Sequence, residues 1–120
     1  NTYDVSDYDD MNELLVAADV LISDYSSCLW DFSITKRPSF VYATDIDKYH
    51  SDDRDFSYPL EKWPYPIARN NDELEAAILS FDTADYAAKV EEHHRDGGIY
   101  DDGHASERVA DVIAKQLKLK

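Results

Sequence analysis

A short apolar run that ends abruptly in polar residues is the feature that most constrains this chain. Residues 20–22 (Val-Leu-Ile) predict a buried parallel strand, and the polar segment 23–27 (Ser-Asp-Tyr-Ser-Ser) follows directly. A helical pattern of apolar residues begins at Cys28. A strand that turns straight into a helix presents the N–H groups of that helix at the carboxyl edge of the sheet, where they favour an anion such as phosphate. The chain is therefore predicted to be an α/β protein with an anion-binding turn at Ser26 and Ser27.

The rest of the chain continues this α/β pattern up to about residue 43. Apolar periodicity and capping residues predict strands at 2–5, 19–23 and 39–43, and helices at 11–18 and 26–35. Segment 44–69 lacks periodicity and is predicted to be a loop, and 70–120 is predicted to be helical. Three strands over 1–43 make only half of a doubly wound sheet. We therefore expect residues 1–120 to form a single, partial, three-layer Rossmann-like domain that belongs to a longer protein.

The charge balance argues against some classes of partner. With 26 acidic and 12 basic side chains, the formal net charge is −14, which disfavours nucleic acid and an anionic membrane surface as partners of this segment. A local anion site is still allowed, because a helix N-terminus and one arginine act within roughly 8–10 Å. The sequence has one cysteine, no glycine-rich phosphate loop and no Cys/His cluster, so it predicts no disulfide, cofactor or metal. No apolar run approaches the roughly 20 residues of a membrane-spanning helix.

Five polar residues are candidates for an anion site, and each has a structural alternative. Ser26 and Ser27 could contact phosphate or cap the helix, and Asp24 could orient the turn or only hold its backbone amides. Asp31, about one turn into the helix, could bind a ribose diol or lie in solvent. Arg54 could clamp a phosphate with its planar guanidinium or pair with the acids around it. The residues alone leave these alternatives open.

The histidines do not form a catalytic or metal-binding pattern. His93 and His94 are adjacent on a charged helix and are expected not to face one direction, which disfavours a metal pair. His104 is expected at the surface, where the last helix begins, and His50 falls in the predicted loop. We therefore predict no general base in this chain.

Several segments carry a family signature. The most specific is 18–27 (ADVLISDYSS), followed by Asp-Phe at 31–32 and Lys-Arg-Pro at 36–38. Supporting segments are 4–15 (DVSDYDDMNELL), Tyr49 with Arg-Asp-Phe at 54–56, and 102–109 (DGHASERV). Together they resemble the CDP-glycerol glycerophosphotransferase family, which includes teichoic-acid primases and polymerases and related capsule enzymes. The resemblance runs almost from end to end.

This resemblance implies a glycosyltransferase B-type fold, in which two Rossmann-like domains enclose the active site. The chain would be the later part of the C-terminal, nucleotide-binding domain. The implied enzyme transfers glycerol phosphate from CDP-glycerol to an acceptor hydroxyl in teichoic-acid or capsule synthesis. The residues carried over are Ser26 and Ser27 for the phosphates, Arg54 as a cationic contact to them, Asp31 for the ribose, and Val5, Ser6 and Asp7 for the loop beside the base.

Two departures from the family pattern limit what this chain is expected to do alone. Asp55 follows Arg54 where the family usually has glycine, and the family's catalytic histidines lie upstream of the matched region. The resemblance therefore assigns no catalytic residue here. By itself the chain is expected to bind nucleotide weakly and to be inactive.

The resemblance also implies partners and a location. The partners are CDP-glycerol or another CDP-alditol as donor, a polyol-phosphate or glycan acceptor, and an N-terminal domain of the same protein that this sequence lacks. The location is the cytoplasm, at the inner face of the cell membrane, with membrane association through the absent part. Two alternatives stay open. One is a nucleotide-sugar glycosyltransferase or epimerase of the same fold, which commonly has glycines at Ser26 and Ser27, and the other is a non-enzymatic acidic interaction domain.

Overall fold

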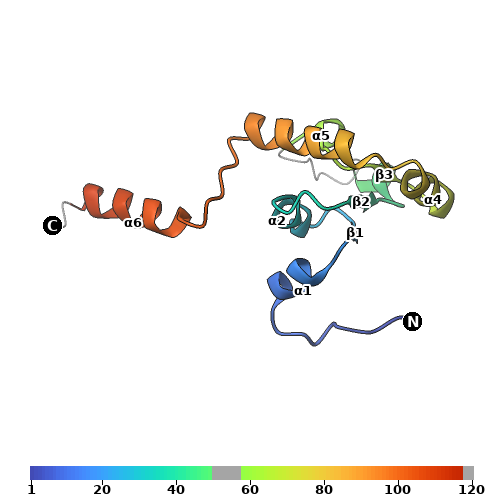
Figure 1. The fold of residues 1–120 in the computed structure, drawn as a ribbon, viewed down its shortest axis with the longest axis horizontal. Coiled ribbons are helices and arrows are strands. Elements are labelled where there is room, and N and C mark those ends of the chain that lie inside the picture. The colour runs from blue at the N-terminus through green and yellow to red at the C-terminus, as the bar shows by residue number, and fades with distance from the viewer. Residues whose placement is uncertain (50–57, 118–120) are drawn as a thin grey trace.

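The chain folds around a small parallel β-sheet, as Figure 1 shows for the computed structural model, which describes residues 1–49 and 58–117. Strands β1 (Leu21–Ser23), β2 (Ser39–Tyr42) and β3 (Ile67–Ala68) lie in the order β1-β2-β3, and both pairs are parallel. The predicted α/β class is confirmed.

Helices connect and follow the strands. They are α1 (Met11–Ala17), α2 (Cys28–Ser33), α3 (Ile46–Tyr49), the short 3₁₀ helix η1 (Leu60–Lys62), α4 (Asn71–Leu79), α5 (Thr83–Asp96) and α6 (Ala105–Gln116). Helices α1 and α2 lie within a few residues of their predicted positions, which is the usual uncertainty of helix ends, and α4, α5 and α6 lie in the segment predicted to be helical. Helices α3 and η1 fall inside the segment that the sequence predicts to be a loop.

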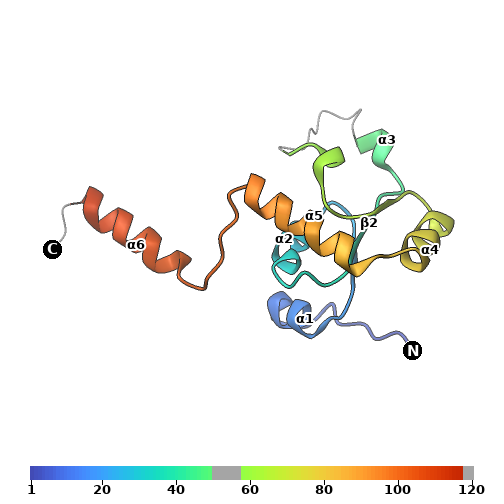
Figure 2. The same cartoon turned by 45° about the horizontal axis from the view of Figure 1, so that its top comes forward.

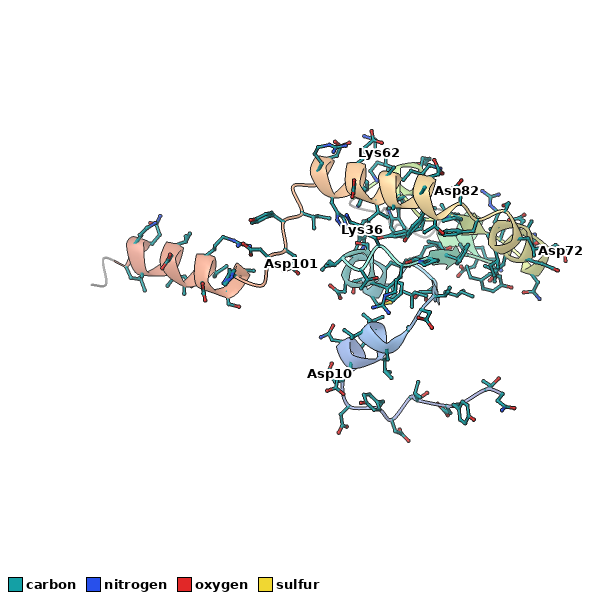
Figure 3. The ribbon with its side chains drawn as sticks, viewed as in Figure 1. Asp10, Lys36, Lys62, Asp72, Asp82 and Asp101 are labelled. Atoms are coloured by element: carbon teal, nitrogen blue, oxygen red, sulfur yellow. The ribbon has the colours of Figure 1, made fainter. Side chains whose placement is uncertain are left out.

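Acidic side chains begin two of these helices, which gives part of the negative charge a structural role. Asp10 Oδ1 accepts a hydrogen bond of 2.8 Å from Asn12 N at the start of α1. Asp82 Oδ1 accepts hydrogen bonds of 2.8 and 3.0 Å from Ala84 N and Asp85 N at the start of α5 (Figure 3). A carboxylate at this position satisfies N–H groups that the helix leaves unpaired and complements the helix dipole.

The core lies where α2 and α5 meet the sheet. Leu29 of α2, Val41 of β2 and Val90 of α5 are each 0% exposed and belong to one apolar cluster. Tyr65 closes this cluster, and its hydroxyl donates a hydrogen bond of 3.0 Å to Leu29 O. Burial raises the pKa of Tyr65, so the hydroxyl stays protonated as that donor. The core therefore fixes α2, and with it the turn that precedes α2.

The predicted strand at 2–5 is wrong, because residues 1–5 have no regular structure. The Asp4 carboxylate accepts hydrogen bonds from Ser6 N at 2.9 Å and from Ser6 Oγ at 2.6 Å. A side chain that bonds its own neighbouring backbone in this way competes with strand pairing. The apolar and aromatic residues at 2–5 therefore do not pair with the sheet.

The third strand is β3, which lies inside segment 44–69 where the sequence predicts only a loop. It is two residues long and follows Pro66, so it is too short to show an alternating pattern. Its hydrogen bonds identify it: Val41 N donates to Pro66 O at 2.9 Å, and Ala43 N donates to Ala68 O at 2.8 Å. The order of elements thus differs from the predicted β-α-β-α-β core at 1–43.

The prediction that residues 20–22 form a buried strand is also wrong in one respect. The strand exists and pairs Ser23 with Val41, but Val20 and Ile22 are each 48% exposed. The reason is that Leu21 packs against the core, so Val20 and Ile22 lie on the opposite face of β1, which is an edge strand of the described sheet. The apolar run therefore predicted the position of the strand correctly, but it did not predict how far its side chains are buried.

Helix α6 lies apart from the rest of the molecule (Figures 1 and 2). None of its residues is buried, although Val109, Val112 and Ile113 form an apolar stripe, and each of them is more than half exposed. The projecting helix explains a radius of gyration of 17.4 Å, compared with about 14 Å expected for a compact domain of this length.

We expect Leu29→Ala to destabilise the chain by about 2–5 kcal/mol, because it removes a fully buried side chain and leaves a cavity between α2 and α5. The matched control is Val109→Ala on α6, which we expect to change stability by no more than about 0.5 kcal/mol. Urea denaturation monitored by circular dichroism measures both. Equal effects in the two variants would contradict the assigned core.

Candidate functional site

The turn between β1 and α2 is exposed and held by its own first residue. Asp24 Oδ1 accepts a hydrogen bond of 2.9 Å from Ser26 N. Ser26 Oγ makes only a long contact, 3.5 Å, with Cys28 N. Ser27 occupies the N-cap position with helical backbone angles, φ −63° and ψ −17°, and makes no side-chain cap hydrogen bond. The hydroxyl of Ser27 is therefore not used as a helix cap, and both serines are exposed at the carboxyl edge of β1.

A second contact joins this turn to the neighbouring strand. Tyr25 OH donates a hydrogen bond of 3.1 Å to Asp45 Oδ1 in the loop after β2. Because β1 and β2 are adjacent and parallel, both loops leave the same edge of the sheet. The turn is thus fixed locally by Asp24 and across the sheet edge by Tyr25.

The structure brings only some of the other predicted site residues to this turn. Asp31 lies in α2 and is exposed, four residues after Ser27 and therefore on the same side of the helix. Arg54 lies outside the described residues, so its predicted contact with phosphate stays a prediction.

The predicted base-side loop, residues 5–7, lies elsewhere in the described structure. In Figure 1 the segment before α1 runs along the side of α1 that faces away from α2. Val5 and Ser6 line a cavity of about 450 Å³, and Asp7 does not. The cavity also has lining residues that the sequence interpretation did not name: Tyr3, Asp4, Tyr8, Met11 and Leu14. The spacing of the last three, i, i+3 and i+6 across the start of α1, is the signal that was available in the sequence.

A hydrogen bond shapes one wall of this cavity. Tyr8 OH donates to Glu13 Oε2 at 2.6 Å, and this bond raises the pKa of Tyr8. Tyr8 therefore presents an aromatic ring beside the apolar side chains of Met11 and Leu14. Such a wall suits a flat ring as a ligand.

An aromatic and histidine cluster on α2 and α5 is the feature that sequence interpretation missed. His93, 6% exposed, stacks on Trp30 with ring centroids 4.9 Å apart and an interplanar angle of 26°. His94 Nε2 lies 2.7 Å from Ser33 Oγ. Since that hydroxyl donates its single proton to Trp30 O at 2.6 Å, Nε2 of His94 must donate to Ser33.

Both adjacent imidazoles therefore contact α2. This differs from the expectation that the two side chains do not face one direction. Both histidines pack α5 against α2. Burial is the main cause that lowers the pKa of His93 and of His94. Among the described residues, no group of three or more His, Cys, Asp or Glu side chains could hold a metal ion. His104 is exposed at the start of α6, as predicted, with Nδ1 3.1 Å from Glu107 Oε2.

A cavity of about 540 Å³ lies beside this cluster, between η1 and the end of α5. Tyr58, Trp63 and His93 form its aromatic part. Charged residues of both signs surround it: Glu61, Lys62, Lys89, Glu92 and Asp96. With three acids against two bases, this cavity does not favour an anion, and the exposed turn remains the candidate anion site.

Known proteins match this chain over almost its whole length. The family model of CDP-Glycerol:Poly(glycerophosphate) glycerophosphotransferase matches residues 1–115. The teichoic acid glycerol-phosphate transferase of Staphylococcus aureus (strain NCTC 8325 / PS 47) is 36% identical over 115 residues, covering 93% of this chain and 30% of that protein. The teichoic acid ribitol-phosphate primase of Bacillus spizizenii (strain ATCC 23059 / NRRL B-14472 / W23) is 36% identical over 115 residues, covering 95% and 29%.

A solved structure matches the fold as well. A variant of the wall teichoic acid polymerase TagF, obtained after a 15 minute soak with CDPG, has a TM-score of 0.74 and 37% sequence identity to this chain. The match covers 96% of this chain and 29% of that one. The chain thus spans about 30% of the length of the curated relatives described above.

We expect the stability of the chain to fall as the pH is lowered from about 7 to about 5. The pKa values of His93 and His94 lie below the ordinary value of 6.5, so below pH 6.5 the unfolded chain binds more protons than the folded chain. The stabilisation is complete above 6.5 and is lost as the pH falls through the lower folded values. Urea denaturation across this range measures the effect.

The combined variant His93→Phe, His94→Gln should flatten this pH dependence. Phenylalanine keeps the ring stacked on Trp30, and glutamine keeps a donor for Ser33 Oγ. A pH dependence as steep as that of the unmodified chain would show that these imidazoles are not its source.

Proposed function

This chain belongs to the CDP-glycerol:poly(glycerophosphate) glycerophosphotransferase family, and on that premise we propose that it is the donor-binding, C-terminal part of a glycerophosphotransferase. The complete enzyme would transfer glycerol phosphate from CDP-glycerol to an acceptor hydroxyl in teichoic-acid or capsule synthesis. The observation that carries the proposal is the match over residues 1–115, which includes the exposed turn at Ser26 and Ser27.

In this proposal the turn binds the diphosphate of the donor. The hydroxyls of Ser26 and Ser27 are exposed, and Asp24 holds the backbone between them and β1. Helix α2 has only six residues, so its dipole is short and the hydroxyls would supply much of the contact. Arg54 would add a positive charge that offsets the developing charge on the transferred phosphoryl group. Support for the diphosphate as ligand comes from family membership together with this exposure.

The remaining donor contacts follow from the same proposal. Asp31, on the same side of α2 as Ser27, would accept hydrogen bonds from the ribose hydroxyls. Val5, Ser6 and Asp7 would lie beside the base, with Tyr8 and Met11 of the adjoining cavity as an apolar surface for the ring. The base-side loop and the turn are separate here, so this proposal requires the donor to span them or the segment before α1 to move.

The acceptor and the catalytic base belong to the rest of the protein in this proposal. A preceding Rossmann-like domain would face this one in a glycosyltransferase B-type arrangement and would contribute the histidine base. The acceptor would be a polyol phosphate or a glycan, and the enzyme would act in the cytoplasm at the inner face of the membrane. None of the described helices is long and apolar enough to cross a membrane.

The alditol of the donor is open to a second candidate. The glycerol-phosphate transferase and the ribitol-phosphate primase are both 36% identical to this chain. We therefore propose a CDP-alditol as the donor class, with CDP-glycerol preferred because the family model describes that substrate.

We expect the full-length enzyme to turn over CDP-glycerol, and to be inhibited competitively by CDP-ribitol more strongly than by UDP-sugars. The reason is that a binding site selects the donor by the contacts of its base and alditol. Initial rates of CMP release with each competitor measure the selection. Competition by UDP-sugars at equal or lower concentration would support a nucleotide-sugar glycosyltransferase, and binding of no nucleotide would support an interaction domain.

We expect Ser27→Ala and Arg54→Ala each to weaken CDP-glycerol binding by about tenfold or more, because a hydrogen bond to a charged group contributes about 1.5–3 kcal/mol. Isothermal titration calorimetry of the full-length protein measures the affinity. The matched controls are Ser106→Ala and Arg95→Ala, which change the same residue types at exposed positions on α6 and α5. Unchanged affinity in both Ser27→Ala and Arg54→Ala would remove the assigned phosphate site.

A further inference from the structure

The hydrogen bond between Tyr25 and Asp45 is a long-range contact at the carboxyl edge of the sheet. The two residues are 20 positions apart in sequence, and the donor–acceptor distance is 3.1 Å. Tyr25 lies in the turn after β1, and Asp45 lies just before α3, in the loop after β2. The bond therefore connects the two loops that leave adjacent parallel strands.

The ring and the hydroxyl of Tyr25 are held by different parts of the structure. The ring is partly buried and packs against the apolar cluster that contains Leu29 and Val41. The hydroxyl reaches the exposed carboxylate of Asp45. Tyr25 therefore fixes the turn to the core at one end and to the neighbouring loop at the other.

The residues on either side of Tyr25 do not join the turn to the loop after β2. Asp24 bonds only within the turn, to Ser26 N, and the N-cap Ser27 makes no side-chain cap hydrogen bond. These local bonds define the shape of the turn but not its position relative to the second strand. The Asp45 side, in contrast, is anchored, since Lys48 N donates to Asp45 O at 2.9 Å as α3 begins.

We propose that Tyr25 and Asp45 are positioning residues that set where the hydroxyls of Ser26 and Ser27 stand for donor binding. This inference rests on the proposed function of the turn and deepens it. The bond is exposed, so it contributes little to folding, whereas a small displacement of the turn changes contacts with a charged ligand directly. Losing the bond should therefore raise the KM for the donor and leave kcat and thermal stability nearly unchanged.

The test is a double-mutant cycle in the full-length enzyme with CDP-glycerol as the probe. Tyr25→Phe removes the donor hydroxyl and Asp45→Ala removes the acceptor, and each should raise KM about fivefold, the effect of losing one net hydrogen bond. The double variant should be no worse than either single variant, because both lose the same contact. Asp45→Asn keeps an acceptor oxygen and should restore KM to near that of the unmodified enzyme.

Tyr42→Phe is the matched control, because Tyr42 OH makes a similar exposed hydrogen bond, 2.8 Å, to Asn71 Oδ1, between the end of β2 and the start of α4, on the side of β2 away from β1. Its KM should not change. Unchanged KM in Tyr25→Phe, or additive effects in the double variant, would overturn the positioning role while the unmodified enzyme still turns over CDP-glycerol. No turnover or binding of CDP-glycerol by the unmodified enzyme would instead overturn the proposed function, and the positioning role with it.

Discussion

The burial of α2 between the sheet and α5 is the contact on which the rest of the structure depends. Leu29 and Phe32 are fully buried, and Tyr65 ties the backbone of α2 to the segment before β3. Helix α2 follows β1 after a turn of only a few residues. The packing of the apolar side of α2 against the core therefore restricts where the turn lies. The candidate site is polar and exposed, but apolar packing beneath it places α2, and the bond between Tyr25 and Asp45 connects the turn to the neighbouring loop.

The acidic composition is compatible with an anionic donor because many of the acids have local structural roles. Asp10 and Asp82 cap helices, Asp24 shapes the turn, and Asp45 accepts a hydrogen bond from the hydroxyl of Tyr25. These carboxylates keep their charge, but salt screens exposed charges from one another beyond roughly 10 Å. The net charge of the chain therefore indicates which large partners its surface disfavours. It does not decide whether a single turn can bind an anion.

The sequence predicted those features that depend on local pattern. Helix positions, the strand-to-helix turn and the family resemblance were confirmed, because caps, periodicity and motifs are local signals. The failure at segment 2–5 has a local cause, because Asp4 bonds to Ser6 two residues later. The other failures required knowledge of distant contacts, since β3 is recognisable only through its pairing with β2. Likewise, the burial of His93 depends on Trp30, which lies far away in sequence.

The edge position of β1 has a consequence for how this chain behaves in isolation. Along its outer side, backbone N–H and C=O groups and the exposed side chains of Val20 and Ile22 form a surface on which another strand could add. The net charge of −14 opposes that association through mutual repulsion between molecules. Added salt would weaken the repulsion that keeps these edges apart. The solubility of the isolated chain should therefore fall as the ionic strength rises.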